Sequence, residues 1–423
     1  MVFVDTMAKL KIAMLTTFYP PYHFGGDAIG CQRLVNSLAA KGYEITVVHD
    51  IDGFTTLSKT SPQPVRPPDN VSVVGLKSRY GSVTNLLTHQ LGRPVIHNKQ
   101  LQSILKPGAF DIIWFHNVSL VGGPGLLSYG DGLKIYEAHE HWLVCPTHVL
   151  WRHNRELCDK RQCNRCAFHY RRPPQLWRYL PFFNRQLDKV DTFIAKSEFS
   201  RNKHKEFGFP KTMQVVPYFL PGKANIRTET SHSPHNRPYF LFVGRLEKIK
   251  GLDDTIPVFA DYPEADLLIL GTGDYETELR SQAKDVPNVK FLGRLAPEQL
   301  ANYYNSAIAL IVPSVCFETF GIIIIESLQQ GTPVIARKIG PFEEIINLSK
   351  AGLLYTNAAE LKDAMLKMQS NPSFRNSLAQ SATKSFNDYW CEQAVMKKYF
   401  TALHEAALAK GNKKVATVLE QEI

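Results

Sequence analysis

Two glutamates in a stretch punctuated by glycine and proline are the residues best suited to chemistry. Glu318 and Glu326 are separated by seven residues. An apolar run that predicts a buried strand ends at Pro313, and a helix-like segment, residues 322–330, follows Gly321. Glu318 then lies in the loop, whereas Glu326 lies on an otherwise apolar helix, where an unpaired carboxylate is costly. A ligand rich in hydroxyl groups, such as a ribose, would account for Glu326.

The start of that helix is suited to binding an anion. A strand, a tight loop and a helix place the loop at the carboxyl edge of a parallel sheet, where open α/β sheets bind ligands. The backbone N–H groups of Phe320, Gly321 and Ile322 have no partner inside such a helix and would face a diphosphate. Glycine at 321 would let that ligand approach the backbone closely. The alternative is that Glu318 caps the helix and Glu326 pairs with a buried Arg or Lys.

Arg245 and Lys250 supply positive charge at the end of another predicted strand. Residues 239–243 predict that strand, and the sequence GRLEKIKG follows it. Two cations at a strand end can neutralise the charge that a diphosphate acquires when its bond to a sugar breaks. A solvated basic turn is the alternative interpretation.

The first half of the chain opens with a strand–helix–strand pattern. Residues 11–16 and 44–48 predict strands on either side of a helix at residues 27–41. Gly25 and Gly26 precede this helix, where backbone amides could contact a phosphate. A dinucleotide-binding fold would show G-x-G-x-x-G, but the glycines here are spaced G-G-x-x-x-G, which argues against a dehydrogenase.

Two strand ends carry histidines. Predicted strands at residues 111–115 and 133–137 run into His116 and His139, and parallel strands would bring both to one sheet edge. A neutral imidazole there can bond a sugar hydroxyl or steer a leaving group, although a lone histidine at a strand end is more often structural. We favour His139, with His141 as the alternative because strand ends are predicted only to within one or two residues.

Four of the seven cysteines cluster with the spacing C-x12-C-x4-C-x2-C. They are Cys145, Cys158, Cys163 and Cys166. A C-x2-C pair can hold a tetrahedral metal from one turn, and the other two thiolates would complete a structural zinc site. Free thiols, a disulfide or an iron–sulfur cluster are the alternatives. No cofactor is expected for catalysis.

The positive charge of the chain is concentrated in one segment. The formal net charge is +10, and residues 145–211 contain 15 Lys and Arg against 6 Asp and Glu. This excess indicates an acidic partner, which would be a lipid headgroup, a membrane surface or an anionic acceptor. Nucleic acid is not expected, because no recognition motif accompanies the charge. The basic and aromatic run at residues 171–184 suits a membrane interface, an acceptor groove or a helix packed on its own domain.

Taken together, these motifs resemble the retaining glycosyltransferases of family 4, which have the GT-B fold. The E-x7-E block, the GTPVIA strand after it and the G-R…K-G turn carry the resemblance, which extends over nearly the whole chain. It implies an α/β protein with two Rossmann-like, doubly wound domains that face each other across a cleft. It also implies transfer of a hexose-type sugar from a nucleotide-diphosphate donor to a hydroxyl acceptor with retained anomeric configuration, in polysaccharide or glycoconjugate biosynthesis.

The resemblance gives each candidate residue a role. Glu318 and His139 become the catalytic residues, with His139 placed over the donor sugar. The residues that would bind the diphosphate, the ribose and the base are Gly25, Gly26, Arg245, Lys250, Gly293, Phe320, Gly321, Ile322 and Glu326. The acceptor is expected to be a glycan, and the basic segment favours a lipid-linked glycan and peripheral membrane association.

The same resemblance sets the expected domain boundaries. Residues 8–220 would form the amino-terminal, acceptor-side domain, with the cysteine-rich and basic segment as an insertion at 145–185. A polar linker at 221–238 would lead to the nucleotide-sugar-binding domain at 239–385. A final helix at 386–408 would cross back to the first domain.

Two further segments are expected to lack regular structure, and no segment looks like a membrane span. Residues 54–68 read as a surface loop, and residues 409–423 read as a frayed polar tail. The chain has no apolar run of about 18 residues. Residues 1–7 are too short and too acidic for a secretory signal, and the odd number of cysteines indicates a reducing compartment. We therefore expect a cytoplasmic protein, which could act at the inner face of the membrane.

Three other classes of protein share parts of this pattern. A phosphorylase with the same fold would break glycosidic bonds with inorganic phosphate. A catalytically silent protein would bind a nucleotide sugar without turnover, which the intact pairs of acidic and basic residues disfavour. A dehydrogenase would bind a nicotinamide cofactor.

Overall fold

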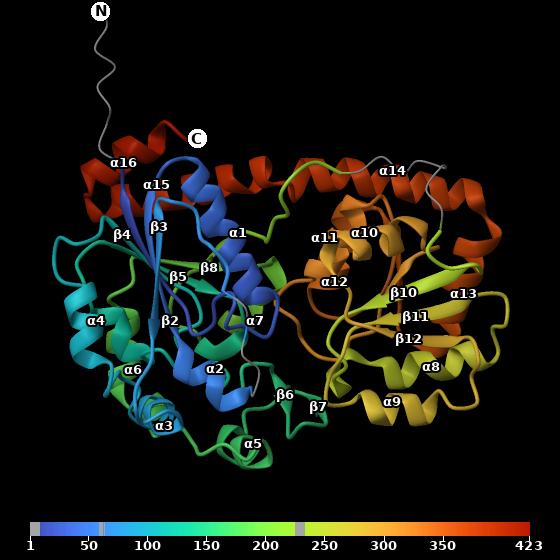
Figure 1. The fold of residues 1–423 in the computed structure, drawn as a ribbon, viewed down its shortest axis with the longest axis horizontal. Coiled ribbons are helices and arrows are strands. Elements are labelled where there is room, and N and C mark those ends of the chain that lie inside the picture. Colours follow the sequence, from blue (N-terminus) through green and yellow to red (C-terminus); the bar gives the residue numbers. More distant parts are fainter. Residues whose placement is uncertain (1–8, 59–61, 63, 225–232) are drawn as a thin grey trace, which may run out of the picture. The chain divides into compact units, whose positions relative to one another are not determined.

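The computed structural model describes residues 9–58, 62, 64–224 and 233–423. Within these ranges the chain divides into two compact units (Figure 1). Unit 1 contains the described residues of Met1–Lys196, Ser200–Pro217 and Met396–Ile423, and unit 2 contains those of Ser197–Phe199 and Tyr218–Val395. The middle of the expected linker, residues 225–232, lies outside the described residues.

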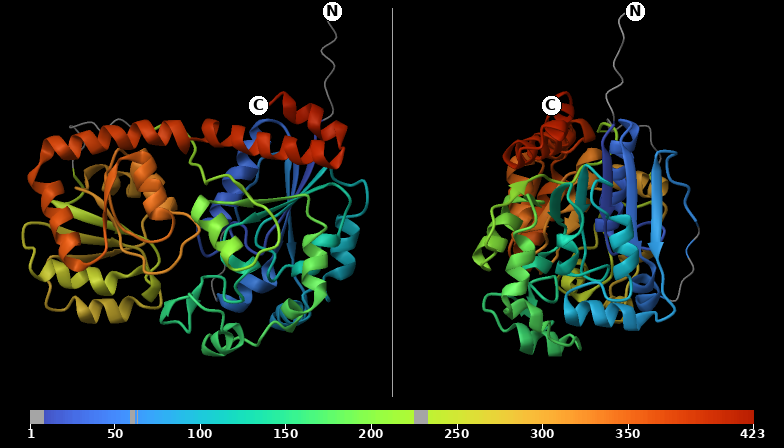
Figure 2. Two further views of the ribbon diagram at one scale, coloured as in Figure 1. Left: turned by 180° about the vertical axis from the view of Figure 1, so that it is seen from behind. Right: turned by 90° about the vertical axis from the view of Figure 1, so that its left-hand side faces the viewer.

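Unit 1 is built on a seven-stranded sheet in which neighbouring strands are parallel. The strand order is β3-β2-β1-β4-β5-β8-β9, with β3 at one edge (Figure 2). The strands are β1 Lys11–Leu15, β2 Glu44–Asp50, β3 Val71–Leu76, β4 Ile112–Phe115, β5 Leu133–Ala138, β8 Thr192–Ala195 and β9 Gln214–Val215. The chain leaves β1 in one direction along the sheet and returns in the other at β4, so the loops after β1 and β4 are neighbours.

Helices and one small ribbon complete unit 1. The α-helices are α1 Gly26–Ala40, α2 Ile51–Leu57, α3 Ser82–Leu91, α4 Asn98–Ile104, α5 Cys163–His169, α6 Pro181–Leu187, α7 Glu198–Glu206, α15 Glu392–Lys410 and α16 Lys413–Glu420. The 3-10 turns are η1 Pro124–Ser128, η2 His141–Leu143 and η3 Leu176–Tyr179. The antiparallel ribbon pairs β6 Trp151–Arg152 with β7 Glu156–Leu157. The first residues of α7 and of α15 belong to unit 2.

Unit 2 repeats the plan with six parallel strands. Their order is β12-β11-β10-β13-β14-β15, so direction reverses between β10 and β13. The strands are β10 Tyr239–Val243, β11 Asp266–Leu270, β12 Val289–Gly293, β13 Leu310–Val312, β14 Val334–Arg337 and β15 Gly352–Tyr355. The helices are α8 Leu252–Ala260, α9 Glu276–Gln282, α10 Pro297–Ser306, α11 Ile322–Gln329, α12 Pro341–Ser349, α13 Ala358–Ser370 and α14 Pro372–Tyr389, with the 3-10 turn η4 Lys248–Lys250.

The apolar runs of the sequence become the central strands of these sheets. In unit 2, one apolar cluster includes Phe240 and Ile311 and another includes Leu241 and Leu310, so side chains that alternate along β10 and β13 enter two cores. Strands that are buried on both faces have nearly continuous apolar sequences. Strand β11, for example, is buried at all five of its positions. The expected α/β fold with two doubly wound parallel sheets is confirmed.

Three expectations about secondary structure are wrong. Residues 54–57 are not loop but the end of α2, because Oδ1 of Asp50 accepts a hydrogen bond from the Gly53 N–H (3.0 Å) and starts the helix. The final helix, expected at 386–408, is two helices that separate near Trp390.

The expected frayed tail is also wrong, because residues 413–420 form α16. Its Val415 and Leu419 are buried, and Asn412 accepts a hydrogen bond from the N–H of Val415 (3.2 Å) as the helix cap. In the part of the chain that the structure describes, no helix combines the length and apolar character that a bilayer span requires.

Candidate active site

Each sheet places predicted site residues at its point of reversal. In unit 2 the loops after β10 and β13 carry Lys250 and Glu318, and these strands are the neighbours between which the order reverses. In unit 1 the loop after β1 leads to Gly25 and Gly26, and β4 runs into His116. Ligands of doubly wound sheets bind outside the carboxyl ends of the strands at such reversals.

Lys250 and Glu318 form an ion pair at the reversal point of unit 2. The Lys250 Nζ lies 2.6 Å from Oε1 of Glu318, and the Ser314 hydroxyl donates to the same oxygen at 3.1 Å. Both charged side chains are about one-quarter exposed. Burial by itself would lower the pKa of Lys250, but the Glu318 carboxylate raises it above its ordinary value. The ammonium therefore stays charged and within reach of an anion.

Backbone geometry brings this pair together. The N–H of Val315 donates to the carbonyl of Ile249 (2.9 Å), which ties the loop after β13 to the turn that carries Lys250. Gly251 has a φ of +73°, and a Cβ there would lie 2.1 Å from the Pro313 carbonyl oxygen. Only glycine permits this conformation and this close approach. Glycine therefore follows Lys250 because it lets the turn that carries Lys250 pack closely against the loop after β13.

Arg245 occupies the same loop but is more exposed. Its guanidinium lies 2.8 Å from a carboxylate oxygen of Glu247, and 57% of its side chain is exposed. An exposed ion pair of this kind is weak. Arg245 can therefore leave Glu247 for a ligand at little cost, in contrast to the partly buried Lys250.

The start of α11 provides the predicted amide-rich site. Among the described residues, no acceptor takes the N–H groups of Phe320, Gly321 and Ile322. Gly321 also has a role in packing, because the space beside its Cα is already filled. A Cβ at that position would lie 2.9 Å from Ile324 and 3.3 Å from Phe342. Packing of α11 against α12 therefore requires glycine here, and the approach of a ligand to the Gly321 N–H stays a prediction.

Glu326 is held on α11 by a tyrosine. The Tyr304 hydroxyl of α10 donates to Oε2 of Glu326 at 3.2 Å. Burial, followed by the neighbouring carboxylate, raises the pKa of Tyr304 well above its ordinary value, so the phenol keeps its proton. Glu326 is partly exposed, and its binding to a ribose stays a prediction.

The remaining glycines differ in what surrounds them. A Cβ at Gly25 would make only an ordinary contact, 3.6 Å from Asp27, and one at Gly293 would meet nothing within 4 Å. Nothing in the protein itself requires the absence of a side chain at Gly25, and Gly26 is exposed as the first residue of α1. Open space beside these residues is compatible with the ligand contacts predicted for them.

His139 lies at the end of β5 in a buried cluster. Its Nε2 is 2.8 Å from Nδ1 of His116, so the structure joins the favoured histidine to the weaker candidate. His141 instead lies against His204, with ring centroids 5.2 Å apart. Both His116 and His139 are buried, and burial lowers the pKa of His116 to about 4 and that of His139 well below its ordinary value.

Sequence reasoning missed three residues of this cluster. Lys196 forms an ion pair with Glu137, and the Tyr399 hydroxyl donates to Glu137 at 2.7 Å while accepting from Lys196 at 2.7 Å. A signal was present, because Glu137 and Lys196 are charged residues inside or directly after apolar strands. Tyr399, on α15, carried no such signal, since an aromatic residue at helical spacing is usually core.

The four predicted metal ligands act electrostatically on one another, but no three of their sulfur atoms lie within 4.8 Å of one another. Burial, followed by the neighbouring thiols of Cys145, Cys163 and Cys166, raises the pKa of Cys158 to about 12. Among the described residues, the groups of three or more metal-ligating atoms within 4.8 Å of one another are His116–Glu137–His139 and Asp50–Asp52–His97. Zinc at the four cysteines stays a prediction.

We expect purified protein to contain about one zinc per chain if this prediction is right. Elemental analysis of the purified chain measures the ratio, and Cys163→Ser/Cys166→Ser should lower it to near zero. The matched control is Cys391→Ser, on a partly exposed cysteine of unit 2. Equal zinc in all three proteins, or none in any, would contradict the site.

The basic and aromatic run divides into an inward and an outward set. Trp177 and Phe183 are buried, and the Arg178 guanidinium lies 4.6 Å from the Trp177 ring centroid and 5.5 Å from that of Phe183. In contrast, Leu176 and Tyr179 are more than 60% exposed. The run is therefore partly a packed element, as one alternative held, and partly a surface.

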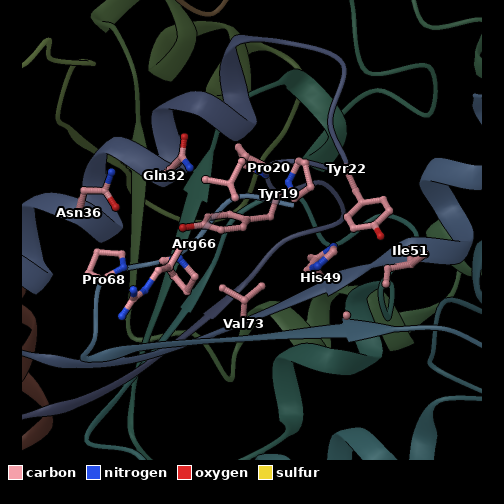
Figure 3. Close-up of a pocket in the computed structure, with 14 residues that line it drawn as sticks. Tyr19, Pro20, Tyr22, Gln32, Asn36, His49, Ile51, Arg66, Pro68 and Val73 are labelled. Carbon is pink, nitrogen blue, oxygen red and sulfur yellow. The ribbon is translucent and has the colours of Figure 1, made fainter. Parts of the chain in front are cut away.

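A separate hollow of about 560 Å³ lies in unit 1. Figure 3 shows the Tyr19 ring between Gln32 and Asn36 of α1 on one side and Val73 of β3 on the other, with His49 nearby. None of the predicted site residues lines it.

Two families of known proteins match the sequence over complementary parts. The family described as "Glycosyltransferase Family 4" matches residues 24–220, and the family described as "Glycosyl transferases group 1" matches residues 225–385. An uncharacterised glycosyltransferase of Methanocaldococcus jannaschii is 25% identical over 422 aligned residues, which cover 92% of this chain and 96% of that protein.

Solved structures resemble the whole chain in fold. Sucrose-phosphate synthase from Thermosynechococcus elongatus has a TM-score of 0.71 at 18% identity, covering 94% of this chain and 100% of that chain. HepE of Anabaena, solved in complex with UDP and glucose, has a TM-score of 0.63 at 18% identity, covering 93% and 99%. At these identities the likeness concerns the fold.

Proposed function

Because the chain belongs to the family 4 type of glycosyltransferases and has their GT-B fold, we propose that it moves a hexose-type sugar from a nucleotide-diphosphate donor to a hydroxyl acceptor. The acceptor would be a glycan in polysaccharide or glycoconjugate biosynthesis. The UDP and glucose bound to HepE of Anabaena support a donor of this class. Membership in this family rules out the dehydrogenase alternative.

The observation that carries the proposal is the Lys250–Glu318 pair at the reversal point of unit 2. An ammonium held by a single carboxylate can exchange that partner for a diphosphate. Glu318 is then released to accept hydrogen bonds from sugar hydroxyls. The N–H groups that start α11 follow Glu318 by two to four residues in the chain and add neutral donors for the phosphate oxygens. Arg245 supplies further positive charge.

The mechanism we favour retains the anomeric configuration and uses the donor diphosphate as the base. The acceptor hydroxyl gives its proton to the departing phosphate oxygen while its own oxygen forms the new bond to the anomeric carbon. Lys250 and Arg245 stabilise the negative charge that develops on the diphosphate, so the site works by positioning and electrostatics. The alternative is a double displacement in which a carboxylate attacks first.

A panel of nucleotide sugars tests the donor class. We expect one or a few nucleotide-diphosphate sugars to raise the melting temperature by binding the folded chain, and the same compounds to be consumed when an acceptor glycan is added. Proton NMR of the product shows whether the anomeric configuration matches that of the donor. Inversion would contradict the retaining mechanism, and no binding of any nucleotide sugar would contradict the function.

Two other functions are separated by the same assay. A phosphorylase would need inorganic phosphate to break a glycosidic bond, so turnover that depends on added phosphate would favour it. A silent binding protein would show the thermal shift without consuming the donor.

The outward set of the basic segment supports a lipid-linked acceptor. We define the apolar–basic patch as Phe168, Leu176, Tyr179, Leu180, Arg165 and Arg172, all of which are exposed. The Tyr179 hydroxyl donates to Asn164 at 2.9 Å, which holds η3 against α5. Exposed apolar side chains beside guanidinium groups suit the interface of an anionic bilayer.

We expect the protein to float with vesicles that contain anionic phospholipid and not with neutral vesicles. Arg165→Glu/Arg172→Glu should reduce the bound fraction several-fold, because each basic residue near such a surface contributes about 1 kcal/mol. The control is Lys284→Glu/Lys290→Glu, which makes the same charge change at exposed positions of unit 2. Failure of the unmodified protein to float would contradict membrane association. Equal flotation of both variants would show that this patch is not the surface that binds the membrane.

A further inference from the structure

The hollow of about 560 Å³ in unit 1 opens beside the edge strand β3. Helix α1 forms one wall, strands β2 and β3 form the floor, and residues 65–68 form the rim (Figure 3). Ligand pockets in proteins have volumes of about 300–1,000 Å³, so this hollow has room for a small molecule.

Gly75 keeps the floor of the hollow open. It pairs with His49 across β3 and β2, so the two residues face the same side of the sheet. A Cβ at Gly75 would clash with the Ile51 side chain and would lie 3.3 Å from the His49 Nε2. A side chain at this position would therefore take the space beside the imidazole, and glycine leaves that space to a ligand.

Four polar side chains of the hollow have no hydrogen-bond partner among the described residues. The Nδ1 of His49 is buried without one, and only 2% of this residue is exposed. The Tyr19 hydroxyl and the side-chain amides of Gln32 and Asn36 also make no hydrogen bond within the described part of the chain. Polar groups inside native proteins are rarely left unpaired, so these four groups indicate a ligand that bonds to them.

The unpaired groups are uncharged at neutral pH. Burial lowers the pKa of His49 to about 4, and burial raises the pKa of Tyr19, so the imidazole carries one proton and the phenol keeps its own. An amide, a neutral imidazole and a phenol each offer a donor and an acceptor. A hydroxyl group also does both, so a ligand with several hydroxyl groups can pair with all four side chains.

Aromatic rings supply the second part of the recognition. The Tyr22 ring stacks on the His49 ring, with centroids 5.5 Å apart, and the Tyr19 ring lies between α1 and Val73 (Figure 3). The face of an aromatic ring is electron-rich and attracts weakly positive C–H groups. A sugar ring can therefore pack its C–H groups on such a face while its hydroxyl groups reach the amides.

Other ligand classes match these walls less well. The one cation among the described lining residues is Arg66, whose side chain is 89% exposed and already paired with Asp69 at 3.2 Å, so a nucleoside diphosphate would lack charge partners. A lipid chain would cover the four polar groups without bonding to them, which is costly. A neutral ligand rich in hydroxyl groups meets both requirements.

We propose that the hollow binds a neutral sugar unit of the acceptor glycan through Gln32, Asn36 and His49. The assignment to the acceptor rests on the proposed function. Tyr22 lies three residues before Gly25 in the loop after β1, so a glycan seated in the hollow continues along that loop toward the carboxyl ends of the unit 1 strands. The hollow then selects which glycan is extended.

Saturation-transfer NMR with neutral trisaccharides of glucose, galactose, mannose, rhamnose or N-acetylglucosamine tests for binding in the absence of nucleotide. We expect at least one of them to bind the full-length protein. Asn36→Trp should weaken that binding by about tenfold or more, because the indole fills the hollow from an exposed position of α1. The control is Ala40→Trp, at an exposed position of α1 that does not line the hollow. Binding of none of these sugars, or equal binding by Asn36→Trp, would overturn the proposal.

His49→Phe tests the hydrogen bond from the imidazole. Phenylalanine keeps an aromatic ring beside Tyr22 but has neither ring nitrogen. We expect several-fold weaker binding of the sugar without a lower melting temperature, because the His49 Nδ1 has no partner to lose. Unchanged affinity, or a loss of affinity that accompanies a lower melting temperature, would overturn the role of His49 as a ligand contact.

Steady-state kinetics separate this inference from the proposed function. With the bound trisaccharide as acceptor, Asn36→Trp should raise KM for the acceptor about tenfold and leave KM for the donor unchanged. An equal rise in both KM values would overturn the assignment to the acceptor. If the unmodified protein turns over no nucleotide sugar, the proposed function fails, while the NMR measurement still decides whether the hollow binds a sugar.

Discussion

Lys250→Ala and Glu318→Ala are each expected to lower kcat for sugar transfer by about 10²–10³-fold or more. On the proposed mechanism the Lys250 ammonium would stabilise the charge that develops on the leaving diphosphate, and a positioned cation in a partly buried site contributes most in the transition state. On the same mechanism Glu318 would hold the sugar through its hydroxyl groups, so its loss would misplace the anomeric carbon. The measurement is initial rate against donor concentration with the nucleotide sugar identified by the binding panel.

The loss cannot be attributed to unfolding, for a reason that the structure supplies. Both side chains of the pair are about one-quarter exposed, so the partner left after either substitution can still be solvated, and the cost to stability should stay below the cost of about 3–5 kcal/mol for a fully buried pair. Melting temperatures should therefore stay close to that of the unmodified protein.

The matched control is Lys248→Ala. Lys248 belongs to the same 3-10 turn and is exposed, and the same positive charge is removed there. It should retain nearly full activity. Turnover like that of the unmodified enzyme in Lys250→Ala or Glu318→Ala would count against the assignment of the site, and a similar loss in Lys248→Ala would point to general electrostatics.

The largest expected effect on stability comes from Lys196→Met. Lys196 and Glu137 have side chains that are 0% and 1% exposed, so removing the cation leaves a carboxylate buried without a charge partner. Breaking one partner of a buried ion pair costs about 3–5 kcal/mol of unfolding free energy. Tyr399 would still donate to Glu137, but a single neutral hydrogen bond does not replace the ammonium.

Denaturation followed by tryptophan fluorescence is the appropriate measurement. Four of the five tryptophans belong to unit 1, so the signal reports mainly the unit that contains the pair. The double variant Lys196→Met/Glu137→Gln should recover most of the lost stability, because it buries no net charge. A cost below about 1 kcal/mol in the single variant would contradict a buried ion pair here.

The pKa of Glu137 predicts the pH range over which the Lys196–Glu137 ion pair stops contributing to stability. Burial would raise the pKa of this carboxyl, but Lys196 and the two histidines lower it from 4.5 to about 2. A carboxyl whose pKa is lower in the folded state stabilises the fold fully above its unfolded pKa, and this contribution disappears as pH falls from about 4.5 to 2. Lys196→Met should remove the dependence on pH in that window.

The sequence alone predicted the alternation of strands and helices and which loops follow the carboxyl ends of strands. Buried strands of a parallel sheet are continuous apolar runs, and glycine, proline and charged residues mark where they end, as after Val312 and Val243. For that reason Glu318 and Lys250 could be placed at strand ends, and the family could be named from their spacing.

Local sequence patterns gave wrong predictions for segments whose structure depends on contacts with distant parts of the chain. The α16 helix forms because Val415 and Leu419 find a buried surface, and the α2 helix forms although glycine and threonine favour it weakly. The sequence also does not show the packing role of Gly321, because it does not reveal that Ile324 and Phe342 fill the space beside it.

Only the tertiary structure decided which charged and polar groups meet. Lys250 and Glu318 are 68 residues apart, and Tyr399 and Glu137 are 262 apart, so no periodicity of the sequence links them. His116 meets Met14 on one side and His139 on the other only because β4 pairs with β1 and β5 pairs with β4. Sequence determines elements through local backbone and side-chain preferences, whereas site chemistry depends on the long-range packing that brings those elements together.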